Sequence, residues 1–267
     1  MQDKAQPEDT LIARTEGAIA RVIFNNPAKH NAVSLEMWEK LDRLLAGFAD
    51  DAGIRVLVIA GAGGKAFVSG ADISKFESER ATRAAADAYN EAAQAAYARL
   101  YHFPKPTIAG IEGYCIGGGV NLAVCCDLRY CTEGSQFGIP AAKLGLGYGH
   151  AGLKKLIDVV GPARAMEMFY TARRFSAAEA YEMGLVNAVV CDGELDAHID
   201  DVTGRIGENA PLTIAAIKAA SRALADDPEN RDLAKLDKMV QACFDSEDYV
   251  EGRSAFMEKR KPRFKGK

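Results

Sequence analysis

The sequence predicts an α/β core followed by a helical C-terminal extension. Through the first part of the chain, short apolar runs rich in β-branched residues alternate with stretches whose apolar residues recur at helical spacing. From residue 194 to residue 259 the spacing is almost entirely helical. Alternation of strands and helices is typical of a sheet covered by helices. We therefore expect an α/β core over residues 1–195 and a helical region over residues 196–267.

The first predicted elements are two strands with a helix between them. Residues 18–25 (AIARVIFN) predict a strand that ends before Pro27. Ser34 is placed to cap a helix whose apolar residues share one face. Residues 54–60 (IRVLVIA) form a continuous apolar run, which is typical of a strand buried on both faces.

The middle of the chain repeats this alternation. Residues 81–100 are rich in alanine and predict a helix, and residues 107–112 (TIAGIE) predict a buried strand. A helix begins near Val120 after three glycines, and residues 128–131 predict a short strand. A further helix is expected over residues 163–169.

The last part of the predicted core is a capped helix followed by a strand. Ser176 is expected to cap a helix that runs to Met183, and Gly184 ends that helix. Residues 185–190 then return as a strand.

Composition and charge restrict the class of protein. The chain of 267 residues has 48% apolar and 26% charged residues, which is ordinary for a soluble domain. A net charge of −4 gives no general attraction to nucleic acid or acidic lipid. The chain starts with a polar segment and has no run of about 18 apolar residues. We expect a cytoplasmic protein with no nucleic-acid or membrane partner, and its six cysteines as mostly buried free thiols.

Two glycine-rich loops, residues 65–73 (KAFVSGADI) and 113–123 (GYCIGGGVNLA), each follow a predicted strand. The second opens a helix, whose unpaired N–H groups favour negative charge. Neither loop has the Walker A spacing, and residues 61–64 do not fit the dinucleotide fingerprint. N–H groups from two separate loops can instead form an oxyanion hole. Tight packing turns without chemistry are the alternative.

Short motifs follow one another along nearly the whole chain. They are residues 26–32 (NPAKHNA), 67–73 (FVSGADI), 105–113 (KPTIAGIEG), 117–119 (GGG), 126–127 (CD), 137–140 (FGIP), 144–145 (LG), 180–187 (AYEMGLVN) and 256–261 (FMEKRK). Each motif is weak alone, but together and in this order they are specific. On these motifs the chain resembles the enoyl-CoA hydratase/isomerase (crotonase) superfamily.

The resemblance implies a crotonase-like spiral of ββα turns, assembled as a homotrimer or a dimer of trimers. It implies an acyl-CoA substrate, with coenzyme A as part of that substrate, and no metal or redox cofactor. The motifs place the N–H groups of Ala71 and Gly118 as the oxyanion hole, where they stabilise a thioester enolate.

The same resemblance implies residues that hold coenzyme A. Ala28 and Lys29, with Asp72 and Ile73, match positions that contact its nucleotide and pantetheine. Phe256 and Lys259 match positions that reach the coenzyme A of a neighbouring subunit, and a solvated basic terminus is the alternative for this tail.

Two positions depart from the pattern of a hydratase, which uses two glutamates on one water. These positions hold Asn121 and Ala141, and neither side chain transfers a proton at neutral pH. Tyr148 and His150 lie among glycines in residues 143–153 and are candidates for the chemistry. The alternative for each is a packed or surface residue.

The segment 144–148 (LGLGY) and the tail from residue 245 are similar to those of methylmalonyl-CoA decarboxylases, a class within the superfamily that has a histidine where this chain has Ala71. Loss of CO2 from a malonyl thioester forms an enolate without a carboxylate base. Three hypotheses follow: a malonyl-type decarboxylase in which Tyr148 orients the carboxylate, a hydratase or isomerase that uses Tyr148 or His150, or a catalytically silent CoA-binding protein.

Overall fold

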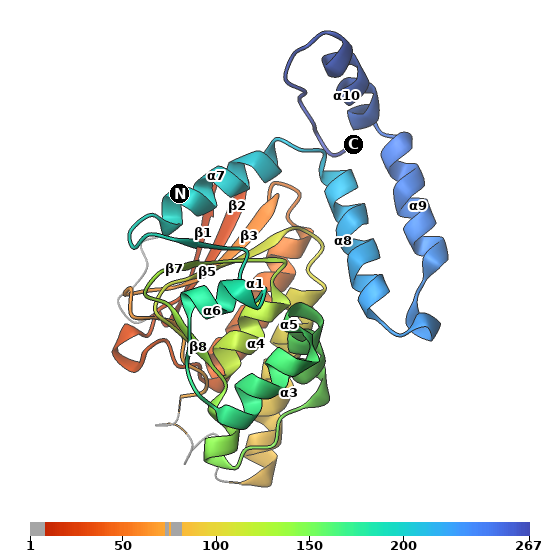
Figure 1. Cartoon of the computed structure of the whole chain (residues 1–267). Helices are drawn as coiled ribbons and strands as arrows, with labels where there is room; N and C mark the ends of the chain where they lie inside the picture. The colour runs from red at the N-terminus through yellow and green to blue at the C-terminus, as the bar shows by residue number, and fades with distance from the viewer. Residues whose placement is uncertain (1–8, 73–74, 76–81) are drawn as a thin grey trace.

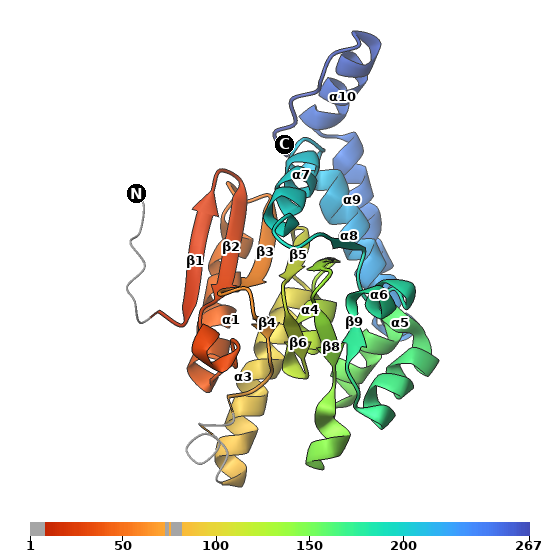
Figure 2. The same ribbon diagram turned by 60° about the vertical axis from the view of Figure 1, so that its left-hand side comes forward.

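A six-stranded sheet forms the centre of the α/β core that the sequence predicts (Figures 1 and 2). The computed structural model describes residues 9–72, 75 and 82–267. The strands lie in the order β1-β2-β3-β5-β7-β10, and all neighbours are parallel except β1 and β2. Their bounds are Leu11–Glu16, Ile19–Phe24, Val56–Gly61, Thr107–Ile111, Leu128–Thr132 and Ala188–Val190.

A second sheet of four strands lies beside the first, in the order β4-β6-β8-β9. Its strands are Ala66–Val68, Tyr114–Ile116, Gln136–Gly138 and Phe175–Ser176. The chain passes from β3 to β4, from β5 to β6 and from β7 to β8, and each pair leads into a helix. Repetition of this unit produces a spiral of ββα turns, in which every turn adds one strand to each sheet.

The helices of the core pack against one side of these sheets (Figure 1). Ser34 caps the first of them, because its hydroxyl accepts from the N–H of Met37 at 3.4 Å. Ser176 forms a full capping box with Glu179, as its position at a helix start predicts. The core helices are α1 (Leu35–Asp50), α3 (Arg83–Tyr101), α4 (Gly118–Cys125), α5 (His150–Thr171) and α6 (Ala177–Glu182), with short 3-10 turns η1 (Pro27–Lys29) and η3 (Pro140–Leu144).

The C-terminal helices divide into one that covers the large sheet and three that extend from the core (Figure 1). Helix α7 (Leu195–Gly207) buries Leu195 and Ile199 against Val58 and Ile108 of the sheet. Helices α8 (Pro211–Ala225), α9 (Leu233–Phe244) and α10 (Glu247–Met257) follow, with η4 (Pro228–Asn230) between the first two.

One carboxylate ties α8 to the core. Asp127 accepts from Lys218 at 2.7 Å and from Arg222 at 2.8 Å, and its other contacts are the N–H and hydroxyl of Thr107 on β5. Because these partners come from β5 and α8, the network fastens α8 to the sheet. No helix within the described ranges has the length and apolar character to cross a membrane.

The sequence patterns found most elements but missed several strands. Strand β1 was missed because it is half exposed and has few apolar residues. Strands β4, β6 and β8 were missed because they have only three residues each. The helix expected over residues 163–169 is present as the second stretch of α5, which follows a break at Gly161 where φ is 76°; the first stretch, from His150, was not expected. The strand expected at residues 185–190 begins only at Ala188.

The six cysteines are free thiols, as expected. Cys115, Cys125, Cys126 and Cys131 are buried, whereas Cys191 is exposed. Burial raises the pKa of Cys125 to about 12, so this thiol stays protonated and unreactive at neutral pH.

Candidate active site

A cavity of about 330 Å³ is bordered by residues 69–71 and 116–118 of the two glycine-rich loops and by the start of α5. This volume lies in the range of small-molecule binding sites. Its walls come from α1, α3, α4 and η3 and from the loops that precede α4 and α5. The lining residues are Trp38, Ser69, Gly70, Ala71, Tyr89, Asn90, Ala93, Gln94, Tyr97, Ile116, Gly117, Gly118, Asn121, Ile139, Pro140, Ala141, Leu144, Leu146, Gly147, Tyr148, Gly149 and Gly152.

The backbone around Ala71 leaves its N–H group outside the local hydrogen-bond ladder. Ala71 forms an isolated parallel bridge with Val33. The N–H of Val33 donates to the carbonyl of Gly70 at 2.8 Å, and the N–H of Asp72 donates to the carbonyl of Val33 at 3.0 Å. The intervening N–H of Ala71 therefore points away from Val33, and Ala71 lines the cavity.

The start of α4 meets this loop closely. Gly118 is the first residue of α4, and a Cβ on it would lie 3.6 Å from the Cα of Gly70. Residue 118 is therefore within contact distance of the loop that carries Ala71, and both line the same cavity. An N–H group in the first turn of a helix has no partner within that helix. Two donors from separate loops are thus available on one side of the cavity.

Glycine at position 119 allows this approach. A Cβ there would lie 2.0 Å from the carbonyl oxygen of Val68, which no side chain tolerates. Gly117 before it has a φ of 55°, a left-handed conformation that favours glycine. The triple glycine therefore serves both the turn and the packing of α4 on β4.

Asn121 and Ala141, which the motifs predict at the two glutamate positions of a hydratase, both line the cavity. Asn121 is 7% exposed and Ala141 is 8% exposed. Among the lining residues that the structure describes, none carries a carboxylate, imidazole, ammonium or guanidinium group. The same described residues contain no cluster of three or more metal-ligating side chains.

Tyr97 and Tyr148 are two of the residues that line the cavity with a hydroxyl group. Tyr148 packs edge-on against Phe169 of α5, with ring centroids 4.7 Å apart. Burial raises the pKa of Tyr148, and it also raises the pKa of Tyr97 well above the usual value. Both phenols are therefore protonated at neutral pH, so they can donate hydrogen bonds but cannot act as bases.

Sequence reasoning missed Tyr97 and the aromatic wall around it. Trp38 donates to the hydroxyl of Tyr89 at 2.9 Å, and that hydroxyl donates to the carbonyl of Val33 at 2.9 Å. The rings of Trp38 and Tyr97 lie edge-on with centroids 4.9 Å apart. The sequence did contain a signal for this wall, because residues 89, 93 and 97 are four apart and so share one face of α3.

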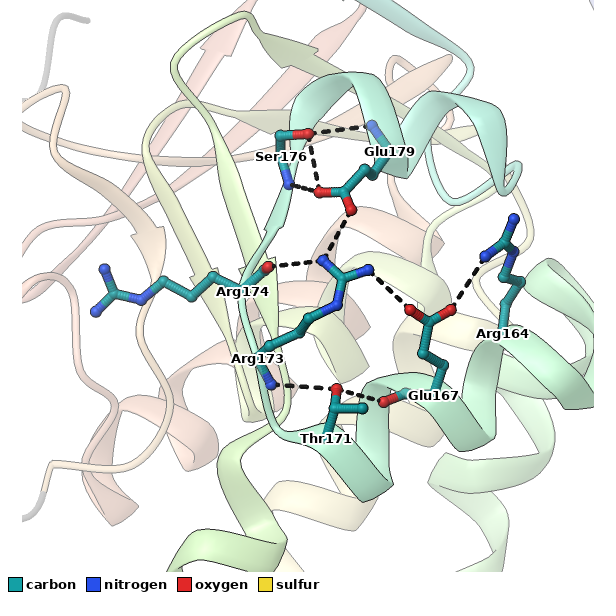
Figure 3. A network of polar contacts seen from close by, with 7 residues as sticks. All are labelled: Arg164, Glu167, Thr171, Arg173, Arg174, Ser176 and Glu179. Carbon is teal, nitrogen blue, oxygen red and sulfur yellow. Dashed lines mark hydrogen bonds and ion pairs between the residues drawn. The ribbon is translucent and has the colours of Figure 1, made fainter.

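A polar network holds the far end of α5, the helix that carries Phe169 (Figure 3). Arg173 donates to Glu167 at 2.8 Å and to Glu179 at 2.7 Å, and Arg164 donates to Glu167 at 3.0 Å. The guanidinium of Arg173 also lies 3.7 Å from the ring centroid of Phe175. These contacts fasten α5 to β9 and α6, and so they fix the wall against which Tyr148 packs.

Several residues singled out from the sequence lie away from the cavity wall. His150 is exposed at the start of α5 and is not among the lining residues. On α10 and just after it, Phe256 is 82% exposed and Lys259 is also exposed. The structure therefore brings Ala71, Gly118, Asn121 and Tyr148 together, without His150.

The residues expected to hold coenzyme A lie next to the Ala71 loop. Ala28 and Lys29 belong to η1, and Lys29 forms an ion pair with the buried Asp72 at 2.9 Å. Ile73 lies outside the described residues.

Comparison with known proteins gives a consistent result. A family model for enoyl-CoA hydratase/isomerase matches residues 14–267. The chain is 32% identical to a crotonyl-CoA hydratase of Syntrophomonas wolfei, over 96% of this chain and 98% of the relative. It is 33% identical to a carnitinyl-CoA dehydratase of Escherichia coli O157:H7, over 97% of this chain and 99% of that protein.

A solved structure has the same fold. It is described as an enoyl-CoA hydratase/carnithine racemase from Magnetospirillum magneticum, with a TM-score of 0.92 and 38% identity. The match covers 98% of this chain and 97% of that one. The spiral that the sequence motifs predict is therefore confirmed.

Proposed function

Because this chain belongs to the enoyl-CoA hydratase/isomerase family, we propose that it binds an acyl-CoA thioester and stabilises the enolate of that thioester. The N–H groups of Ala71 and Gly118 are the donors to the thioester oxygen. Two observations support this assignment. The bridge to Val33 leaves the N–H of Ala71 free, and Gly118 lies in the first turn of α4. Loss of one such donor typically costs roughly 3–4 kcal/mol of transition-state stabilisation.

The reaction we propose is decarboxylation of a malonyl-type acyl group. The main support is that Asn121 and Ala141 line the cavity at positions where hydration would need two carboxylic acid side chains. When CO2 leaves, the electron pair of the broken C–C bond forms the enolate directly, so no side chain needs to remove a proton. An uncharged cavity also favours loss of charge from the carboxylate, because a buried anion without a cationic partner is costly.

Tyr148 orients the carboxylate in this proposal. Its phenol is protonated, since burial raises its pKa, and it therefore donates a hydrogen bond to an anionic oxygen. Contact with Phe169 holds the ring in one orientation. The same protonation state argues against Tyr148 as the base of a hydratase, and the exposed position of His150 argues against that residue.

Coenzyme A binding and assembly complete the proposal. Lys29, held by Asp72 beside the Ala71 loop, is placed to meet a phosphate. Large apolar side chains are exposed on α8, α9 and α10, including Ile217, Val240 and Phe256. Such a surface favours a homotrimer or a dimer of trimers, in which Phe256 and Lys259 reach the coenzyme A of a neighbour.

The test compares methylmalonyl-CoA with crotonyl-CoA as substrates of the purified protein. We expect CO2 release from the first and no loss of enoyl absorbance with the second. Tyr148→Phe should lower the rate of CO2 release at least tenfold, whereas Tyr170→Phe, at a 77% exposed position on α5, should not change it. Hydration of crotonyl-CoA, the reaction suggested by the names of several relatives, would reject decarboxylation in favour of a hydratase. Binding of both thioesters without turnover would identify a catalytically silent protein.

A further inference from the structure

An unpartnered hydrogen-bond acceptor lies inside the cavity. Asn121 on α4 is 7% exposed, and its side chain lines the cavity. Among the residues that the structure describes, no donor reaches its Oδ1 atom. A buried carbonyl oxygen without a donor is destabilising, so a ligand or solvent molecule is expected to supply one.

The first turn of α5 lies beside this oxygen. A Cβ on Gly152 would be 2.9 Å from Oδ1 of Asn121, so only the missing side chain lets the helix approach so closely. No side chain caps α5 at Gly149, and the first backbone bond there runs from the N–H of Leu153 to the carbonyl of Gly149 at 3.2 Å. Within the described part of the chain, the N–H groups of residues 150–152 have no acceptor.

The two sets of groups favour a molecule that both donates and accepts hydrogen bonds. The N–H groups require an acceptor, and Oδ1 of Asn121 requires a donor. A carboxylate or a thioester oxygen accepts only, whereas a water molecule does both. Water that is buried in proteins typically has about three polar partners, which acceptors and donors beside it supply.

We propose that a water molecule bound between Asn121 and the first turn of α5 protonates the enolate; this role rests on the decarboxylation proposed above. After CO2 has left, the electron pair of the enolate takes a proton from the water and forms the new C–H bond at the α carbon. The remaining hydroxide takes a proton from bulk solvent. The net reaction consumes one proton and releases CO2 and the acyl thioester.

The surroundings suit both states of this water. The N-terminal end of α5 carries partial positive charge, which favours hydroxide as it forms. The amide of Asn121 does not titrate, so it fixes the direction of one O–H bond while the other is directed to the substrate. Asn121 is therefore a positioning residue, because it acts on the reaction through the water.

The decisive measurement is the stereochemistry of protonation. Methylmalonyl-CoA decarboxylated in D2O gives propionyl-CoA with one deuterium at the α carbon. We expect wild-type protein to give one configuration, and Asn121→Leu, which removes both polar atoms at similar volume, to give both in near-equal amounts. Asn121→Asp retains an acceptor oxygen and should restore the single configuration, even if repulsion of the substrate carboxylate raises KM. The same configuration from wild type and Asn121→Leu, or a mixture from wild type, would overturn the role.

A crystal structure tests the water site without reference to turnover. Wild-type protein should show an ordered water within hydrogen-bond distance of Oδ1 of Asn121 and of an N–H in residues 150–152, and Asn121→Leu should lack it. Absence of an ordered water at this position in wild-type crystals refutes the site. If wild-type protein releases no CO2, the proposed decarboxylation fails and the proton-delivery role fails with it, while this crystallographic comparison still decides the site.

Discussion

The hydroxyl of Tyr97 on α3 donates a hydrogen bond to the carbonyl oxygen of Gly118 at 3.1 Å. Gly118 is the first residue of α4, and a Cβ at that position would lie 3.1 Å from the same hydroxyl. One phenol therefore contacts the residue whose N–H we assign to the thioester oxygen. Because Tyr97 is also held edge-on by Trp38, it connects the aromatic wall of the cavity to the proposed oxyanion hole.

Removal of this hydroxyl should weaken catalysis without disturbing the fold. A hydrogen bond of this kind contributes about 1 kcal/mol, so Tyr97→Phe should lower kcat/KM roughly fivefold, with a similar fall in kcat. Tyr101→Phe removes a hydroxyl from the same helix outside the cavity wall and should leave both constants unchanged. Steady-state kinetics with thermal unfolding as a check on the fold distinguish the two. Equal kinetics for Tyr97→Phe and wild type would show that the hydroxyl does not position Gly118.

Gly119 should tolerate no side chain. Its Cβ would lie 2.0 Å from the carbonyl oxygen of Val68, and relief of this clash requires movement of β4 or α4. We expect Gly119→Ala to destabilise the protein by about 3 kcal/mol or more and to abolish turnover. Gly47→Ala, at an exposed position in α1 where a Cβ meets nothing within 4 Å, should instead stabilise by about 0.5–1 kcal/mol. Chemical denaturation measures both, and equal stability of the two variants would contradict the packing argument.

The sequence predicts those parts of the fold in which local pattern and packing agree. The strand at residues 54–60 is nearly all apolar because β3 is central and buried on both faces, and the pattern found it. The caps at Ser34 and Ser176 are formed as predicted, since capping depends on a few neighbouring residues. Strands of three residues, such as β4 and β8, leave no period to detect, and their pairing with neighbouring strands defines them.

The sequence likewise predicted some residues of the site and missed others. Ala71 and Gly118 came from ordered motifs, and the structure places both at one cavity. Tyr97 was missed because its contact with Gly118 joins residues far apart in the chain, and its helix carries only a weak apolar stripe. Glycines around His150 suggested that its side chain enters a cavity, but the α5 start turns it to solvent. Local sequence cannot show which way a side chain points at a helix start.

The exposed apolar side chains of α9 should be needed for self-association. Val240 is 50% exposed, and a charge at this position would remain unpaired inside an apolar interface. We expect wild-type protein to have the mass of a trimer or hexamer by light scattering, and Val240→Glu to shift it to a monomer. Lys238 is also exposed on α9 but already carries a charge. Lys238→Glu therefore places no new charged group at an apolar position and should keep the wild-type mass. Monomeric wild-type protein would refute the proposed assembly.

Acid should release the C-terminal tail through a carboxylate on α10. Glu251 accepts from two nitrogens of Arg260, at 2.7 and 2.9 Å, and from the N–H of Arg263 at 2.8 Å. These donors lower the pKa of Glu251 from 4.5 to about 2. A lowered pKa means that the stabilisation is present above the ordinary value and is lost as pH falls toward about 2.

Hydrogen exchange of residues 258–267 at pH 5 and pH 2.5 measures this effect. In wild-type protein, protection of the tail, after correction for the intrinsic exchange rate, should be lower at pH 2.5. Glu251→Gln lacks the titrating group, so the tail up to Arg263 should have low protection at both values, whereas residues 265 and 266 remain bonded to Asp248. Because the pair is exposed, added salt should reduce the wild-type protection at pH 5. Equal tail protection in wild type at both pH values would mean that Arg260 and Arg263 do not hold the tail through this carboxylate.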